Sequence, residues 1–308
     1  MKSKRVVAEA PASSANLGCG FDTFAIALAG PKDRLTLAKA GSRVSLEVEG
    51  PKDMREQPAT NVVSAVAMVM LSEHGIRSGV TMKLAKGVPV GIGLGSSAAS
   101  SVATAVGIDR LFDLGLSQKE LLGYAGVGER SASGTAHYDN VSASLMGGFV
   151  IVGWDHGCVR MEPPKSMALC LVTPRVKLPK EKTKYARSLL PKEVGLEQAV
   201  AVARAAGTLI HGFAAGNLDE IGDAMGVSLV DERRAVMVPA FQRVREAAIS
   251  HGASGACISG AGPTVLAVCE KRVSGRVLRA MVREFRSRGV RSSGFVSRPG
   301  NGCRVVES

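Results

Sequence analysis

The sequence predicts an α+β protein of two domains, and three observations support this. The chain has 308 residues, a length that suits two domains of roughly 150 residues each. Its first half alternates short apolar strands with helices around a glycine-rich stretch. Its second half follows the order strand, helix, strand, strand, helix, strand, which is typical of a ferredoxin-like domain. We expect domains at 1–160 and 161–308, joined by a linker over 154–165 that contains Pro163 and Pro164.

The elements of the first half are predicted from apolar periodicity and from helix-capping residues. Strands are expected at 6–8, 34–39, 44–49, 80–84 and, after a helix end, within 145–152. Helices are expected at 61–74 and 97–111. Ser117 and Glu120 have the spacing of a capping box, which predicts the start of another helix.

The second half is read in the same way. Strands are expected at 167–172, 255–259, 264–269 and 292–297, and helices at 196–215, at 218–225, from about 239 and around 276–288. In the last of these, Arg276, Arg279, Arg283 and Arg286 repeat at helical spacing opposite apolar residues. This pattern predicts an amphipathic helix with a basic, solvated outer face.

Composition narrows the classes of function. No window offers the roughly 18 apolar residues that a membrane-spanning helix needs. The basic residues of 1–5 are followed by only three apolar residues before the charged Glu9. Because this charge interrupts any apolar region, we expect no secretion signal and a cytoplasmic protein. The net charge of +12 suggests attraction to polyanions, but only 4% of residues are aromatic, so we expect a phosphate-rich substrate and no specific nucleic acid. The six cysteines are far apart and are expected to be free thiols.

The most informative stretch is the glycine-rich loop at 89–98, followed by a helix of small residues. Gly91, Gly93 and Gly95 allow positive φ angles and the close approach of a bulky anion. Ser96 and Ser97 then open the helix, whose unpaired N–H groups and dipole favour a phosphate. The loop lacks the lysine of GxxxxGK[ST] and breaks the GxGxxG spacing. Taken alone, it is equally consistent with a flexible turn capped by serine.

The full string, Pro-x-x-x-Gly-Leu-Gly-Ser-Ser-Ala, resembles the signature loop of the GHMP kinases (galactokinase, homoserine kinase, mevalonate kinase and phosphomevalonate kinase). Residues 259–264, Ser-Gly-Ala-Gly-Pro-Thr, resemble the C-terminal glycine-rich motif of that family. Residues 10–22 resemble its first motif in the homoserine kinase form, although Cys19 stands where many relatives have proline. Residues 137–141 resemble the His-x-Asp-Asn-Val segment of the same subgroup.

The resemblance has the matching order from residue 10 to residue 264. It implies the two-domain GHMP kinase fold, with an N-terminal domain like domain 2 of ribosomal protein S5 and a ferredoxin-like C-terminal domain. It also implies ATP as cosubstrate, Mg²⁺, and phosphorylation of the hydroxyl of L-homoserine in threonine biosynthesis. A homodimer is a further expectation from the resemblance.

Site residues are carried over from the resemblance. Arg187 and Arg234 are assigned to the homoserine carboxylate and Asp22 to its ammonium group. Positioning of the substrate is assigned to Asn16, His137, Asn140 and Thr183, and Mg²⁺ to Ser97 and Glu129. ATP binding is expected at Pro89, Val90, Gly91, Ile92, Gly93, Leu94, Gly95, Ser96, Ser97, Ala98, Ala99, Asn61, Val62, Gly260 and Gly262.

The catalytic group is expected to comprise Asn140, Glu129 and Asp139. Some relatives use an Asp as base with a neighbouring Lys, and Asp139 lies in the corresponding region, but the first motif contains no Lys. Our hypothesis is that the hydroxyl proton passes to the phosphate itself while Asn140 orients the oxygen.

Each assignment has an alternative. Asp22 could cap a helix, His137 could belong to the core, and Glu129 could pair with Arg130 on the surface. The two arginines could be solvated, with Arg233 pointing inward instead of Arg234. Lys182 and Lys184 are predicted to be solvated charges, with contact to phosphate as the alternative. For function, the alternatives are a kinase of another small alcohol, of the mevalonate or shikimate type, or a non-catalytic regulatory or RNA-associated member of the fold.

Overall fold

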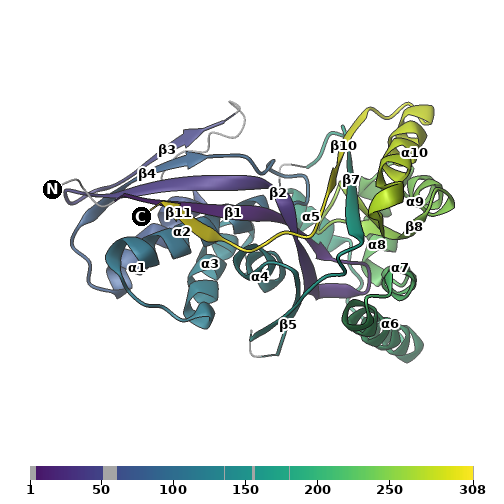
Figure 1. The fold of residues 1–308 in the computed structure, drawn as a ribbon, viewed down its shortest axis with the longest axis horizontal. Helices are drawn as coiled ribbons and strands as arrows, with labels where there is room; N and C mark the ends of the chain where they lie inside the picture. The colour runs from purple at the N-terminus through teal and green to yellow at the C-terminus, as the bar shows by residue number, and fades with distance from the viewer. Residues whose placement is uncertain (1–4, 51–60, 135, 155–156, 180, 308) are drawn as a thin grey trace.

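The computed structural model describes residues 5–50, 61–134, 136–154, 157–179 and 181–307, which form two sheets with helices packed on them (Figure 1). The first sheet has the order β11-β1-β2-β4-β3, and β5 and β6 extend it along the first part of β2. Its strands are β1 (Arg5–Asn16), β2 (Gly20–Ala40), β3 (Val44–Glu49), β4 (Gly79–Ala85), β5 (Phe149–Val152), β6 (Cys158–Met161) and β11 (Arg304–Glu307). One face carries α1 (Val62–Glu73), α2 (Ser96–Phe112), α3 (Gln118–Ser133) and α4 (Tyr138–Met146).

The second sheet has the ferredoxin-like order β10-β7-β9-β8, with all neighbours antiparallel. It consists of β7 (Met167–Pro174), β8 (Ala253–Ile258), β9 (Val265–Glu270) and β10 (Ser292–Ser297). One face is covered by α9 (Phe241–Ser250) and α10 (Ser274–Ser287), and the other by α6 (Leu196–Ala215) and α7 (Leu218–Met225). Along β7, Leu169 and Leu171 pack toward α6 and α7, whereas Cys170 and Val172 pack toward α9 and α10. Because both faces are covered, β7 is apolar over residues 167–172.

The two sheets share a packed boundary. The rings of Phe149 in β5 and Phe213 in α6 stack with their centroids 3.9 Å apart. Beside them, the Ser14 and Ser259 hydroxyls share a hydrogen bond of 2.7 Å, and Gly260 N donates to Ala15 O at 3.1 Å. The first motif and the second glycine-rich motif therefore meet in space, although Asn16 and Gly260 are 244 positions apart in the chain.

Most predicted elements are confirmed, including the capping box of Ser117 and Glu120 and the apolar inner face of α10. The expected linker over 154–165 is wrong for Cys158–Met161, which pairs with β5 as β6. Only the end of α4 was expected, and the short helices α5 (Lys182–Ser188) and α8 (Leu229–Arg234) were not expected. The division at 160/161 stays a prediction, and strand β11 near the end of the chain lies on the first sheet beside β1.

The six cysteines are free thiols, as expected. Among the helices that the structure describes, none combines the length and apolar character needed to cross a bilayer.

Candidate functional site

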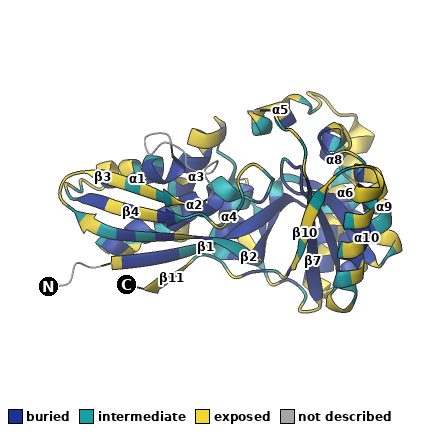
Figure 2. Cartoon of the chain, turned by 90° about the horizontal axis from the view of Figure 1, so that it is seen from above, coloured by how far each residue is buried: buried dark blue, intermediate teal, exposed yellow. Residues whose placement is uncertain are grey.

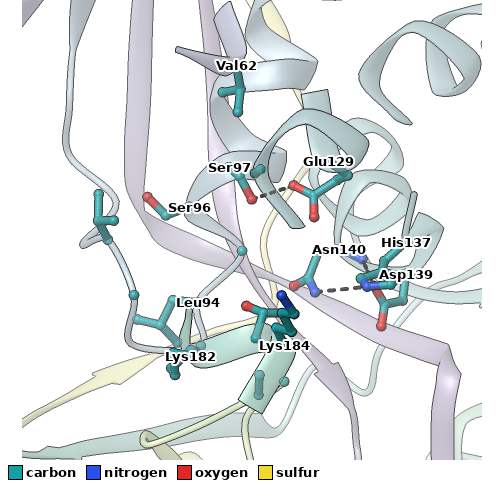
Figure 3. Close-up of a pocket in the computed structure, with 18 of the residues that line it drawn as sticks. Val62, Leu94, Ser96, Ser97, Glu129, His137, Asp139, Asn140, Lys182 and Lys184 are labelled. Carbon is teal, nitrogen blue, oxygen red and sulfur yellow. Dashed lines mark hydrogen bonds between the residues drawn. The ribbon is translucent and has the colours of Figure 1, made fainter. Parts of the chain in front are cut away.

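A cavity of about 860 Å³ opens between the two sheets and receives residues from both (Figure 3). Most predicted site residues line it: Asn16, Asp22, Asn61, Val62, Val90, Gly91, Gly93, Leu94, Gly95, Ser96, Ser97, Glu129, His137, Asp139, Asn140, Thr183, Arg187, Arg234 and Gly260. Five do not reach its wall: Pro89, Ile92, Ala98, Ala99 and Gly262. Residues from distant parts of the chain are thus brought together as the motifs predicted.

The phosphate loop depends on three glycines. Gly91, Gly93 and Gly95 have φ angles of +76°, +86° and +64°, a region that residues with a Cβ rarely adopt. A Cβ at Gly95 would lie 2.3 Å from Ser13 Oγ, so this position has no room for a side chain. Gly95 is also the N-cap of α2, and no side chain caps that helix. The first N–H groups of α2 are therefore left for a ligand.

The serines after the loop have separate contacts. Ser96 Oγ donates to Val88 O at 2.9 Å, which closes the loop on itself, so this hydroxyl does not cap α2. Ser97 Oγ donates to Glu129 Oε1, and Figure 3 shows this contact at the start of α2. Ser97 therefore joins the loop to α3.

Lys86 and Asp33 form a buried ion pair beneath the loop that the motifs did not reveal. Lys86 Nζ also donates to Ser96 O at 2.8 Å and to Ser100 Oγ at 2.7 Å. Asp33 Oδ1 accepts from the N–H groups of Gly87 and Val88 at 3.0 and 2.9 Å. The pair fixes both ends of the loop. Its only signal in the sequence was a lysine directly before the loop, since Asp33 comes from β2.

Glu129 is 7% exposed and its carboxyl faces the cavity, so it is not part of a surface ion pair. Burial, with a smaller contribution from the nearby Asp139, raises the pKa of Glu129 to about 7. In the described residues no group of three or more His, Cys, Asp or Glu could hold a metal ion. Mg²⁺ bound with a nucleotide needs only one or two carboxylates, because phosphates and waters supply the other oxygens. The Ser97 hydroxyl and Glu129 carboxyl fit that role.

Asp139 holds Asn140 in place. Asp139 Oδ1 accepts from the backbone N of Asn140 at 2.6 Å and from its Nδ2 at 3.2 Å. Asn140 Oδ1 in turn accepts from Ser13 Oγ at 2.8 Å, directly beside Gly95. Burial and the charge of Asp22 raise the pKa of Asp139 to about 6. The amide of Asn140 is therefore oriented on both sides.

The charged end of the cavity is built around Arg187. Its Nη2 contacts Asp22 Oδ1 and Oδ2 at 2.9 and 2.6 Å, and its Nε donates to His137 Nε2 at 3.1 Å. Burial and the charge of Arg187 lower the pKa of His137, so a neutral ring that can accept this bond is favoured. The Phe21 ring lies 5.4 Å from the guanidinium carbons of both Arg187 and Arg234. His137 and Arg187 are thus cavity residues and not isolated core or surface groups.

Arg234 is the inward member of its pair, since it is 3% exposed whereas Arg233 is exposed. It donates to Gly260 O at 2.9 Å and to Ala186 O at 3.3 Å. Asn16 Nδ2 also donates to Gly260 O, at 3.1 Å, and its Oδ1 accepts from Asp22 N at 3.2 Å. These contacts join the first motif, α8 and the second glycine motif around one carbonyl.

The remaining predicted residues lie at the rim or have structural contacts. Asn61 is the N-cap of α1, where its Oδ1 accepts from Val63 N at 3.0 Å. Thr183 lies on α5, which stands apart from both sheets (Figure 2). Lys182 is half-buried and not fully solvated as expected, and its Nζ donates to Gly262 O at 2.6 Å. Lys184 is exposed and pairs with Glu181, as expected.

Comparison with known proteins shows that segments in both halves of the chain match the same protein family. Residues 61–148 match the GHMP kinases N terminal domain, and residues 209–287 match the GHMP kinases C terminal family. The homoserine kinase of Thermoplasma volcanium is 35% identical over 308 residues, covering 99% of this chain and 98% of that protein. The homoserine kinase of Methanopyrus kandleri is 41% identical over 266 residues, covering 85% and 87% of the two chains.

Solved structures are also similar to this chain over nearly its full length. The crystal structure of homoserine kinase from Cytophaga hutchinsonii superposes with a TM-score of 0.90 at 33% identity, covering 99% of this chain and 98% of that one. A mevalonate kinase structure has a TM-score of 0.71 at 15% identity, which reflects a shared fold. The likeness therefore extends over the whole length of the chain.

Proposed function

Because this chain belongs to the GHMP kinase family, we propose that it transfers the γ-phosphoryl group of ATP to the side-chain hydroxyl of L-homoserine. The products are O-phospho-L-homoserine, ADP and a proton, and the reaction serves threonine biosynthesis. One observation carries the proposal: a single cavity joins a loop of backbone amides to a cluster of charged side chains suited to an amino acid. A phosphate donor and a zwitterionic acceptor can therefore meet in it.

The triphosphate is held mainly by backbone. The loop from Gly91 to Ser97 and the uncapped first turn of α2 offer N–H groups and the positive end of the helix dipole. These groups stabilise negative charge on the transferred phosphoryl group without having to reorganise during the reaction. Asn61 and Val62, at the start of α1, are proposed to contact the adenine.

Ser97 and Glu129 would hold Mg²⁺ with the nucleotide. The ion would supply charge neutralisation and alignment of the phosphates. Glu129 must lose its proton to serve as a ligand, and its raised pKa of about 7 sets the pH range in which it does so.

The acceptor is oriented by charge. The guanidinium groups of Arg187 and Arg234 would bind its carboxylate, since a planar fork of donors matches two carboxylate oxygens. Asp22 would bind its ammonium group. In the ligand-free protein Asp22 and Arg187 contact each other, so substrate binding exchanges one ion pair for two. Asn16, His137 and Thr183 are proposed to complete this wall.

The proton of the hydroxyl is proposed to leave with the phosphate. Phosphoryl transfer has a loose transition state, so it needs positioning and charge neutralisation more than a strong base. Asp139 is already engaged by two N–H donors of Asn140. In this scheme Asn140 orients the oxygen of the hydroxyl, and Asp139 orients Asn140.

Two alternatives to the proposed function are phosphorylation of a different alcohol and a protein without catalytic activity. A mevalonate or shikimate acceptor has a carboxylate but no ammonium group, so it would offer Asp22 no positive charge to replace that of Arg187. A non-catalytic protein would have no use for a glycine loop that excludes side chains or for the Ser97–Glu129 contact.

The test is an ATP-consumption assay with L-homoserine, L-serine, L-threonine and mevalonate side by side. Activity with L-homoserine should exceed that with the other compounds by at least about tenfold, since the cavity matches its charges and length. A preference for mevalonate would contradict L-homoserine as the acceptor but not the kinase activity. No ATP consumption with any of the four compounds would contradict the kinase activity itself. A homodimer and a cytoplasmic location remain proposals, open to light scattering and cell fractionation.

A further inference from the structure

Lys182, the first residue of α5, is half-buried. Its Nζ donates to Gly262 O at 2.6 Å, and the residue lines the cavity. Lys184, two residues later, also lines the cavity, but its side chain is 76% exposed and pairs with Glu181 at 3.3 Å. The two lysines of one short helix are therefore in different environments.

Among the described cations around the cavity, Lys182 and Arg234 donate to carbonyl oxygens, whereas others form ion pairs. Lys86 pairs with Asp33, and Arg187 pairs with Asp22. Among the described residues no carboxylate lies within 4.0 Å of Lys182 Nζ, the limit for an ion pair, and its hydrogen bond goes to a neutral carbonyl. Burial, followed by the positive charge of Arg234, lowers the pKa of Lys182 to about 8. A cation in such a position is costly unless an anion joins it.

The carbonyl that Lys182 contacts lies against the phosphate loop. A Cβ on Gly93 would stand 2.9 Å from Gly262 O and 2.3 Å from Ser259 O. Ser259 Oγ donates to Gly93 O at 2.7 Å, and Thr264 N donates to Ile92 O at 3.3 Å. The ammonium group is thus held where the second glycine motif meets the loop. In Figure 3, Lys182 lies near Leu94, away from Ser97 and Glu129.

We propose that Lys182 binds the γ-phosphoryl group of the nucleotide during transfer and is a catalytic residue of the reaction. On binding, its Nζ contacts a phosphoryl oxygen in place of, or in addition to, Gly262 O. It thereby supplies from α5 the lysine that the phosphate loop lacks. The inference rests on the proposed kinase function, and it places a positive charge on the side of the phosphoryl group opposite Ser97 and Glu129.

The first experiment compares Lys182→Met, Lys182→Arg and the control Lys192→Met, which changes an exposed lysine that does not line the cavity. Lys182→Met should lower kcat with L-homoserine by about a hundredfold, because a charge that stabilises the transferred group is lost. Lys182→Arg should recover part of this loss, and Lys192→Met should stay within about twofold of the wild type. Equal activity of Lys182→Met and Lys192→Met would overturn the inference.

A second experiment separates this inference from the proposed function. Binding of ADP and of the non-hydrolysable ATP analogue AMP-PNP is measured by calorimetry, together with the melting temperature. Lys182→Met should weaken AMP-PNP about tenfold and ADP less than twofold, since ADP lacks the γ-phosphoryl group. Equal weakening of both nucleotides, or of neither, would contradict it. This measurement needs no acceptor, so it remains decisive if the wild type phosphorylates a different alcohol.

Discussion

The two ends of the cavity recognise their ligands by different means. At the phosphate end, between Gly91 and Ser97, the donors are mainly backbone N–H groups, and the glycines keep side chains away. At the acceptor end, Asp22, His137 and Arg187 act through charged or polar side chains that contact one another. A site made of backbone should be sensitive to added atoms, whereas a site made of side chains should be sensitive to lost charge. The following predictions test this difference, beginning with the largest effect.

Gly95→Ala should be the most damaging change at the phosphate end. The new Cβ would lie 2.3 Å from Ser13 Oγ and 2.8 Å from Asn140 Oδ1, at a φ of +64°. We expect kcat/KM to fall about a thousandfold and the free energy of unfolding to fall by about 2–4 kcal/mol. Enzyme kinetics and urea denaturation would measure these effects.

Gly91→Ala is the matched control, because φ is +76° there but no atom lies within 4 Å of the new Cβ. It should cost only about 1 kcal/mol of conformational strain. If both alanine variants behave alike, close contact does not explain the need for glycine.

Arg187→Met should act on the acceptor alone. Loss of the guanidinium group should raise the KM for L-homoserine about a hundredfold, while the Kd for ATP changes less than threefold. Arg233→Met, which removes an exposed arginine of α8, is the control and should have no measurable effect. A parallel loss of ATP affinity in Arg187→Met would show that the two ends of the cavity are not separable.

The pH dependence of nucleotide binding should report on Glu129. Its pKa is raised to about 7, so the charged form needed by Mg²⁺ appears as the pH rises through that value. Mg²⁺-dependent binding of AMP-PNP should therefore tighten about tenfold from pH 6 to pH 8. In Glu129→Gln the binding should be weak and independent of pH over this range. A wild-type affinity that is constant from pH 6 to pH 8 would remove Glu129 as the ligand.

The same raised pKa has the opposite consequence for the stability of the ligand-free protein. Protonated Glu129 suits its buried site, so its contribution is fully present below the unfolded value of 4.5 and is lost as the pH rises through about 7.

Asp139→Asn should have the smallest effect. The asparagine Oδ1 can still accept the two bonds from Asn140, so turnover should stay within about fivefold of the wild type. The turnover rate, the affinity for ATP and the melting temperature of the variant, each compared with the wild type, would test this. A near-complete loss of turnover, with folding and ATP binding intact, would instead identify Asp139 as the base.

Much of the fold followed from local patterns. The strict alternation in β3 predicted both of its bounds, and the capping box of Ser117 and Glu120 predicted the start of α3. The succession of strands and helices in the second half predicted the ferredoxin-like sheet. The strand β6 was hidden by the charged and glycine residues around it, and α5 and α8 were too short to show a helical period. β11 pairs with residues nearly 300 positions away, which no local pattern encodes.

The site was predictable where motifs specify it and not where folding assembles it. The loop and the residues around Asn140 came from ordered strings of residues. Lys86 was not identified, and Lys182 was expected to be solvated, because their contacts depend on Asp33 and Gly262, which lie 53 and 80 positions away. The choice between Arg233 and Arg234 also needed the structure, because adjacent residues on a helix face different directions.

The pairing of β11 with β1 has a practical consequence. β11 covers one side of β1, the strand that carries the first motif, and Glu9 of β1 also pairs with Arg304 at 3.1 Å. Trimming residues 301–308 would uncover the N–H and C=O groups along that edge. Such an exposed edge invites strands of other copies to pair with it, so shortened chains should aggregate before they lose their catalytic geometry.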